Sequence, residues 1–152
     1  MGLDQYLHAE NYISGHSQKE LLGEALRLAN AESFVDNYLP SASISVRVGY
    51  WRKANQVHQW FVDNVQRGED NCGRYYVSRE QLRELLDTCK QVRASKHPDV
   101  ANDLLPPQVG FFFGSNEIDE WYWEQVDSTI ALLSRLLETV PEEWDFYYSS
   151  SW

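Results

Sequence analysis

Alternating hydrophobic and polar positions predict strands near both ends of the chain. In residues 3–9, Leu3, Gln5, Leu7 and Ala9 fall on one side, opposite Asp4, Tyr6 and His8. This period of two is typical of a half-buried strand. Residues 43–48 are rich in β-branched side chains and alternate in the same way, which predicts a second strand. Shorter strands are expected within 72–77 and 144–148.

Apolar positions at helical spacing predict four helices. The first covers about 18–30, and the second starts at the strand-to-helix junction of residues 50–55 and ends near Arg67-Gly68. The third follows Ser78, whose spacing from Gln81 is that of a capping box. The fourth opens around Asn116 and is stopped by Pro141.

The remaining segments complete the expected fold. Residues 95–108 are polar and contain prolines, so we expect a loop that is either functional or mobile. Residues 109–115 form a short apolar run between glycines, which indicates a buried strand. The chain is therefore expected to be a single α+β domain over 1–152, with a small mixed or mostly antiparallel sheet and about four helices. A doubly wound parallel fold is the alternative.

The charge distribution limits the function classes. The 152 residues carry 13 Lys and Arg against 23 Asp and Glu, a net charge of -10. Residues 97–152 hold a single base, Arg135, against eleven acids. General nucleic-acid binding is disfavoured because it needs a basic stripe. The acidic third is either a surface for a basic partner or a solvated helix.

Localisation and redox chemistry follow from composition. No run of about 18 apolar residues is present, so no membrane span is expected. The N-terminus lacks the features of a signal peptide, which predicts a cytoplasmic protein. Cys72 and Cys89 do not have the spacing of a metal site or a disulfide framework.

The strongest candidate for a ligand contact is the stretch from Trp51 to Asn55, Trp-Arg-Lys-Ala-Asn, at a strand-to-helix junction. Arg52 and Lys53 are expected in the first helical turn, where unpaired backbone N–H groups and two cations would favour a phosphate or carboxylate. The alternative is that both cations pair with acids of the C-terminal third, such as Asp119, Glu120 or Asp145.

Adjacent aromatic residues are candidates for stacking on a planar base. In a strand, Tyr75 and Tyr76 must face opposite sides, as must Tyr147 and Tyr148, so one of each pair is exposed or lines a cleft. The alternative is that the aromatics fill the core. With an anion site beside them, such platforms would form a nucleotide pocket.

Other motifs carry weaker signals. Ser115 follows Gly114 at an expected helix start, where backbone amides could hold phosphate, but the pattern is neither a P-loop nor a nucleophile elbow. An N-cap role is the simpler interpretation of Ser115. His58 is either a hydrogen-bonded, partly buried residue or a base. The four histidines share no metal-ligand spacing, so no metal or cofactor is expected.

Several strings resemble a family of small proteins carried by tailed phages and prophages. They include Gly-Leu-Asp from Gly2, Tyr-Trp-Arg-Lys-Ala-Asn from Tyr50, Gly-Phe-Phe-Phe-Gly-Ser from Gly110 and Asp-Phe-Tyr-Tyr from Asp145. The resemblance spans nearly the whole chain. It implies a phage origin and assigns no catalytic residue. By analogy with small phage proteins of this size, it suggests an accessory factor that interferes with host defence.

The leading hypothesis is a protein that sequesters a nucleotide-derived molecule without turnover. Stacking is assigned to the aromatics, phosphate binding to Arg52 and Lys53, base recognition to Asn55, and ribose or amine binding to Asp4 or Asp119. The candidate ligand-binding residues are Trp51, Arg52, Lys53, Asn55, His58, Tyr75, Tyr76, Ser115, Asp119, Tyr147 and Tyr148.

Two other functions are considered. The first is an interaction protein that docks its acidic 97–152 surface on a basic host protein. The second is a small hydrolase that uses His58 with a carboxylate. The surplus of aromatic residues also suggests a homo-oligomer with a shared pocket.

Overall fold

The sheet is the organising element of the molecule, and its four strands pair only in antiparallel sense. The computed structural model describes residues 2–36, 38, 40–110 and 113–152. The strand order is β2-β1-β4-β3. The elements in chain order are β1 (Asp4–Ser14), α1 (Lys19–Leu28), β2 (Ser41–Arg52), α2 (Asn55–Asn64), β3 (Tyr75–Val77), α3 (Arg79–Ser95), α4 (Pro98–Leu104), α5 (Glu120–Thr139) and β4 (Asp145–Ser151). The α+β prediction is confirmed, and the parallel alternative is wrong.

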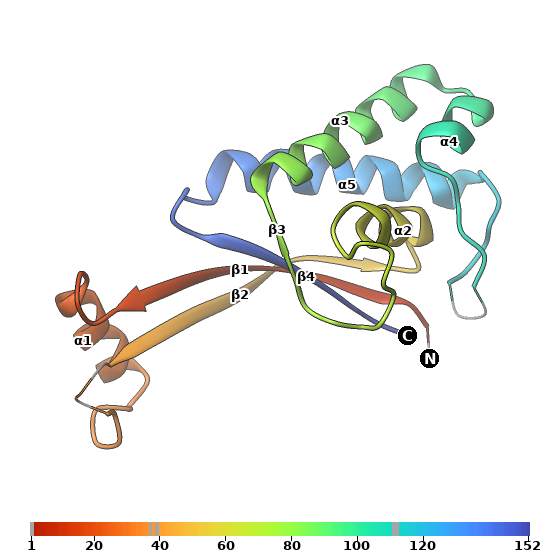
Figure 1. The fold of residues 1–152 in the computed structure, drawn as a ribbon. Coiled ribbons are helices and arrows are strands. Elements are labelled where there is room, and N and C mark those ends of the chain that lie inside the picture. Colours follow the sequence, from red (N-terminus) through yellow and green to blue (C-terminus); the bar gives the residue numbers. More distant parts are fainter. Residues whose placement is uncertain (1, 37, 39, 111–112) are drawn as a thin grey trace.

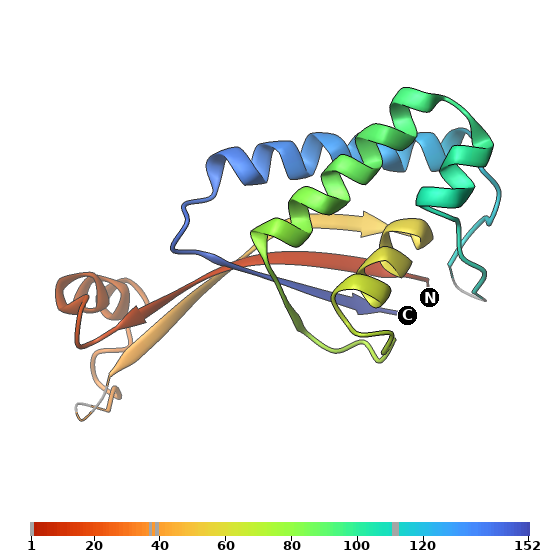
Figure 2. The ribbon, with the colours of Figure 1, turned by 45° about the horizontal axis from the view of Figure 1, so that its top comes forward.

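The helices α2, α3 and α5 all lie on one side of the sheet (Figures 1 and 2). Along β1 the residues Gln5, Leu7 and Ala9 are buried toward these helices, whereas Tyr6 and His8 alternate with them and are only partly buried. The sheet therefore has one face in the core and one face open, as the period of two along β1 predicts.

The core between sheet and helices is built from both layers. Trp51, Phe61, Leu85, Leu133 and Tyr148 belong to one buried cluster. The rings of Phe61 and Tyr148 stack with centroids 3.9 Å apart. Several aromatic side chains therefore fill the core, as one of the two interpretations predicted, and these are not available on the surface.

The β1–β2 hairpin extends beyond the helices as an arm that carries α1 at its end (Figure 1). Ile13 and Leu22 form the small buried centre of this arm. Ile44 and Val46, which pair with Asn11 and Ala9 on the helix side of the sheet, stay 41% and 45% exposed because no helix reaches them. The arm is thus held by the strand ladder more than by a core.

The predicted capping box on α3 is confirmed. Ser78 accepts from the backbone N–H of Gln81, and the Gln81 side chain accepts from the Ser78 N–H. The prediction of a loop over 95–108 is wrong for its central residues, because helix α4 forms there. Pro98 occupies the first helical turn and the His97 side chain accepts from the Asp99 N–H, a start signal for a helix.

The strand expected at 109–115 is not found among the described residues of that segment. Val109 is 80% exposed, and residues 109, 110 and 113–115 form no strand; residues 111 and 112 lie outside the described residues. The last helix begins at Glu120 rather than near Asn116, and Asp119 caps it by accepting from the Tyr122 N–H. None of the helices described here is both long and apolar enough to cross a membrane.

Candidate ligand-binding face

The two cations of the Trp-Arg-Lys-Ala-Asn stretch do not lie in a helix. Arg52 is the last residue of β2, and α2 begins at Asn55. Lys53 has φ 55° and its N–H donates to the Leu3 carbonyl at 2.8 Å, so the chain reverses between strand and helix at Lys53. The prediction that both cations occupy the first helical turn is wrong, since β2 continues four residues beyond Val48.

The flanking residues of that stretch are buried and serve the fold. Trp51 is 3% exposed and its indole N–H donates to Thr129 on α5 at 2.9 Å. Asn55 donates to the carbonyls of Phe113 and Ser115 and accepts from the Gln108 N–H at 2.9 Å. Neither side chain is exposed for stacking or base recognition, and Asn55 instead holds the 105–119 connection against α2.

The Gly-Ser motif packs against this same junction. Gly114 has φ 90°, and a Cβ there would lie 3.3 Å from the Cβ of Lys53, so both the backbone angle and the close approach favour glycine. Ser115 accepts from the Glu117 N–H in a local turn, and the N-cap role belongs to Asp119. The fold therefore brings the Trp51–Asn55 stretch and the Gly114-Ser115 motif together. The contacts between them stabilise the fold and do not form a ligand site.

His58 lies in a buried network. Its Nδ1 is 2.8 Å from the Tyr148 hydroxyl and its Nε2 is 3.0 Å from the Asp70 carboxylate, and both rings are fully buried. Gln5 Oε1 lies 3.3 Å from the same hydroxyl and is a second acceptor for its single proton. Burial raises the pKa of Tyr148 well above its usual value, so the hydroxyl stays a donor. The network joins α2, β1, β4 and the loop before β3.

The paired tyrosines alternate as predicted. Tyr148 is buried, whereas Tyr147 is partly exposed and Tyr76 is 56% exposed. Tyr75 is partly buried and its hydroxyl donates to Asn71. Among the tyrosines predicted to bind ligand, Tyr76 and Tyr147 are therefore the two on the open side of the sheet, where they contact each other with ring centroids 5.9 Å apart.

The open face of the sheet gathers Asp4 and Arg52, which the sequence assigns to the ligand, with four side chains that it does not assign: Tyr6, His8, Arg47 and Tyr50. The register places Tyr6 opposite Tyr50, His8 opposite Arg47, and Asp4 opposite Arg52. These six residues share the alternation side of Tyr147. We call the group Asp4, Tyr6, Arg47, Tyr50 and Arg52 the first cluster.

The first cluster surrounds a shallow depression of about 360 Å³. The Tyr6 and Tyr50 rings are 5.7 Å apart, and the Arg47 guanidinium is 5.7 Å from the Tyr6 centroid. Asp4 accepts from the Tyr50 hydroxyl and from Arg52 at 2.9 Å. The Tyr50 hydroxyl, with a smaller contribution from Arg52, lowers the pKa of Asp4, so this carboxylate is ionised at neutral pH.

We call the group Glu10, Arg74, Tyr76 and Tyr147 the second cluster. The Arg74 guanidinium lies 3.9 Å from the Tyr147 centroid and pairs with Glu10. His8 lies between the two clusters, opposite Tyr147 on β4 and Arg47 on β2. Partial burial, with Arg74 and Arg47 nearby, lowers the pKa of His8. The open face thus carries Arg47, Arg52 and Arg74 together with three acids, which are Asp4, Glu10 and, opposite Glu10 on β4, Asp145.

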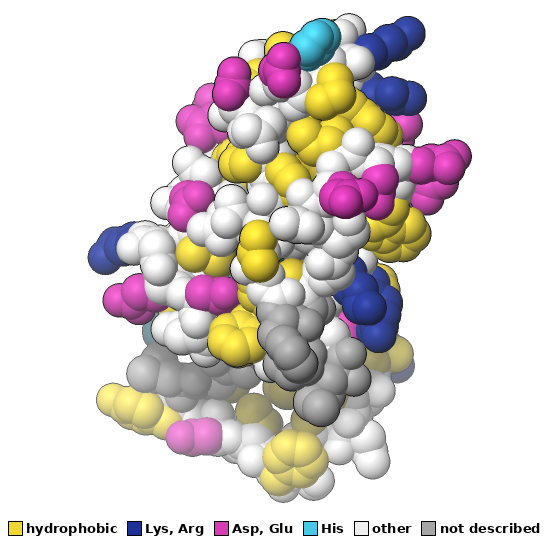
Figure 3. All heavy atoms as spheres, turned by 90° about the vertical axis from the view of Figure 1, so that its right-hand side faces the viewer, with side chains coloured by type: hydrophobic (Ala, Val, Ile, Leu, Met, Phe, Trp, Pro, Cys, Tyr) yellow, Lys and Arg dark blue, Asp and Glu magenta, His cyan; other side chains and the backbone are white. Residues whose placement is uncertain are grey.

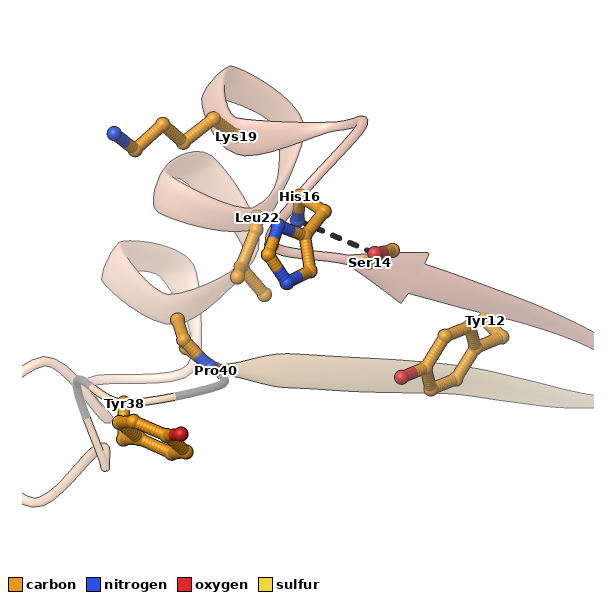
Figure 4. A pocket seen from close by; sticks show the side chains of 8 residues that line it. Tyr12, Ser14, His16, Lys19, Leu22, Tyr38 and Pro40 are labelled. Carbon is orange, nitrogen blue, oxygen red and sulfur yellow. Dashed lines mark hydrogen bonds between the residues drawn. The ribbon is translucent and has the colours of Figure 1, made fainter.

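A second depression, of about 370 Å³, lies on the arm (Figure 4). Tyr12, His16 and Tyr38 lie around its apolar floor, which includes Leu22 and Pro40. The Lys19 side chain extends away from Tyr12 in this view. The cavity thus offers aromatic contacts but fewer cations than the open sheet face.

Comparisons with protein-family models, curated proteins and solved structures gave no match for this chain. Among the residues that the structure describes, no three His, Cys, Asp or Glu side chains are grouped to hold a metal ion. Cys89 is buried, which raises the pKa of its thiol to about 12. The open sheet face is therefore the candidate site of the described residues.

One signal for the missed residues was present in the sequence. Tyr6 and His8 alternate with the apolar side of the first strand, Arg47 lies in the strand predicted over 43–48, and Tyr50 follows that strand by two residues. Their assembly depends on the register, which a bulge between Leu7 and His8 shifts by one residue. Sequence periodicity does not reveal that shift.

Proposed function

We propose that this protein binds and sequesters a nucleotide-derived molecule on the open face of its sheet, without turnover. The observation that carries the proposal is the first cluster, where two tyrosine rings and two arginines surround one depression. The sequence placed the site on the whole Trp51–Asn55 stretch. The site proposed here keeps only Arg52 of that stretch and includes residues of the neighbouring strand β1. A phage accessory role, including interference with host defence, remains part of this proposal.

The chemistry of the first cluster suits a base joined to a phosphate. A tyrosine ring offers a stacking surface that accepts any base, and a guanidinium offers paired N–H donors to phosphate oxygens. Asp4 accepts hydrogen bonds and can bind a ribose hydroxyl or an exocyclic amine. The ligand thus receives an aromatic, a cationic and an acceptor contact from adjacent strands.

The ion pairs on this face leave the arginines available. The Arg52 and Asp4 side chains are 52% and 22% exposed, and exposed pairs of this kind contribute only about 0–1 kcal/mol. Arg52 directs one of its five donors to Asp4, while Arg47 forms no ion pair within the described part of the chain. A phosphate can therefore be accommodated without breaking a strong contact.

The proposal is tested by releasing small molecules from freshly purified protein and identifying them by mass spectrometry. The host cells should have active nucleotide signalling. We expect a stoichiometric nucleotide from the wild type and its loss from the double variant Arg47→Ala with Arg52→Ala. The matched control is Arg83→Ala, which removes a similarly exposed arginine from helix α3.

Retained melting temperature in all variants would show that loss of ligand is not loss of fold. Equal ligand content in the double variant would refute the proposed site. Wild-type protein that releases no nucleotide and binds none on titration would refute the function.

A second candidate is the acidic interaction surface of residues 97–152. Charge gives it some support, since Glu120 and Glu124 are exposed on α5. However, Asp127 pairs with Arg93 at 2.7 Å and Asp119 caps the helix. At the end of the molecule shown in Figure 3, acidic side chains are interspersed with hydrophobic ones. Recovery of a basic host protein at low salt, and its loss on reversal of Glu120 and Glu124, would favour this candidate.

A homo-oligomer remains a proposal that the arm supports. Ile44 and Val46 are exposed on β2, which is an edge strand and has a neighbouring strand only on its β1 side. Exposed apolar side chains on such a strand favour association. Light scattering after size exclusion would measure it. We expect Ile44→Lys with Val46→Lys to reduce any oligomer to the 17.7 kDa monomer.

A further inference from the structure

The open face carries two aromatic and basic clusters rather than one. Both combine a tyrosine pair with an arginine next to a ring: Tyr6 and Tyr50 with Arg47 in the first, Tyr76 and Tyr147 with Arg74 in the second. Each has a carboxylate paired to an arginine, Asp4 or Glu10. Each therefore offers tyrosine rings, a guanidinium and a carboxylate, with two arginines in the first cluster and one, Arg74, in the second.

The distance between the clusters sets the size of a ligand that fills both. Tyr50 and Tyr147 are separated by two strand spacings across the sheet and two residues along it. This places their backbones about 12 Å apart. A single base stacks on one platform, so stacking on both platforms requires two bases, which a phosphate can join.

The side chains between the clusters suit such a connection. His8 lies on β1 between Arg47 and Tyr147, and it is partly buried. Ser149 and Ser151, on the same side of β4 as Tyr147, lie opposite Tyr6 and Asp4. A linking phosphate would thus meet an imidazole, hydroxyls and two guanidiniums, and the carboxylates of the Glu10–Asp145 pair lie two residues further along the strands.

We propose that the two clusters are subsites for adjacent bases, and that the ligand class is an oligonucleotide of at least two units. A short single strand and a cyclic dinucleotide share this chemistry. The inference rests on the proposed function and deepens it, since it specifies how many bases the same face holds. The whole molecule remains acidic, so a long single strand is repelled outside the face.

The test measures affinity as a function of ligand length. Thymidine monophosphate and thymidine oligomers of two, four and eight units are titrated calorimetrically against the full chain, together with cyclic di-AMP and the linear dinucleotide pApA. We expect affinity to rise at least tenfold from one unit to four and to change little from four to eight. Tight binding of cyclic di-AMP over pApA would identify a cyclic signal as the source, and the reverse would identify a linear strand.

Variants locate the two subsites. Tyr50→Ala and Tyr147→Ala should each reduce the affinity for the four-unit oligomer to that of the monophosphate. Tyr38→Ala removes an 85% exposed tyrosine on the arm and should leave both affinities unchanged. Melting temperatures confirm that each variant is folded.

The outcomes separate this inference from the function beneath it. Equal affinity for one unit and four would overturn the two subsites and leave nucleotide binding in place. The absence of binding by every probe would overturn both. An affinity that continues to rise beyond four units, with no loss in Tyr147→Ala, would also contradict the two-subsite arrangement.

Discussion

Replacing Tyr148 by Phe should destabilise the fold without altering the open face. The substitution keeps the ring stacked on Phe61 and removes one hydroxyl, which lies 2.8 Å from His58 Nδ1. His58 is fully buried, so no water replaces the lost partner. A buried polar atom without a partner costs about 1–3 kcal/mol.

For a chain of this length, 1 kcal/mol shifts the melting temperature by about 2–4 °C, so we expect a decrease of about 2–12 °C. The control is Tyr147→Phe, on the adjacent residue, whose hydroxyl forms no hydrogen bond within the described part of the chain. Its free energy of unfolding should change by less than about 0.5 kcal/mol.

The assay is thermal and urea unfolding followed by far-UV circular dichroism and tryptophan fluorescence. Equal stability of the two variants would refute the assignment of His58 and Tyr148 to the structure. Loss of ligand binding in folded Tyr148→Phe would return both residues to the site, as the sequence first suggested.

Three further outcomes are expected. Asn55→Ala should accelerate hydrogen exchange at the Gln108 amide, because that N–H loses its acceptor; unchanged exchange would contradict the role given to Asn55. The pKa of His8 is lowered in the fold from its ordinary 6.5, so the unfolded chain takes up the proton first and stability falls as pH drops below about 6.5. His8→Gln should show a smaller decrease in melting temperature between pH 7.5 and pH 5.5, and an identical decrease would refute this. Nucleotide affinity should weaken several-fold as NaCl rises from about 50 to 500 mM, because the arginine contacts are exposed; insensitivity to salt would exclude phosphate binding by them.

Local signals predicted most of the elements. The alternation in residues 3–9 extends to Ser14 in β1, and the Ser78–Gln81 capping box opens α3 as expected. The miss at α4 was avoidable, because Pro98 is a start signal for a helix. Apolar content indicates a buried strand only where something covers it, and Val109, at the start of the expected 109–115 strand, is exposed.

Some residues of the proposed open face, such as Arg52 and Tyr147, are named by the sequence, whereas others depend on the register of the sheet. The prediction that one tyrosine of each adjacent pair is exposed is confirmed for Tyr147 and Tyr148, because the alternation of side chains along a strand is a local property. By contrast, the partner of Arg52 is Asp4, 48 residues away, rather than an acid of the C-terminal third. Such pairs follow from strand order and register, which are non-local, and burial of Trp51 follows from α5 covering β2.

We propose that the ligand binds on the open sheet face, and chemical-shift mapping tests this proposal most directly. Uniformly ¹⁵N-labelled protein is titrated with the four-unit thymidine oligomer, and amide shifts are assigned to strands. We expect the largest amide shift changes at five residues of the open face: Tyr6, His8, Arg47, Tyr50 and Tyr147. Changes confined to the arm cavity, or to α2 around Asn55 and His58, would contradict it.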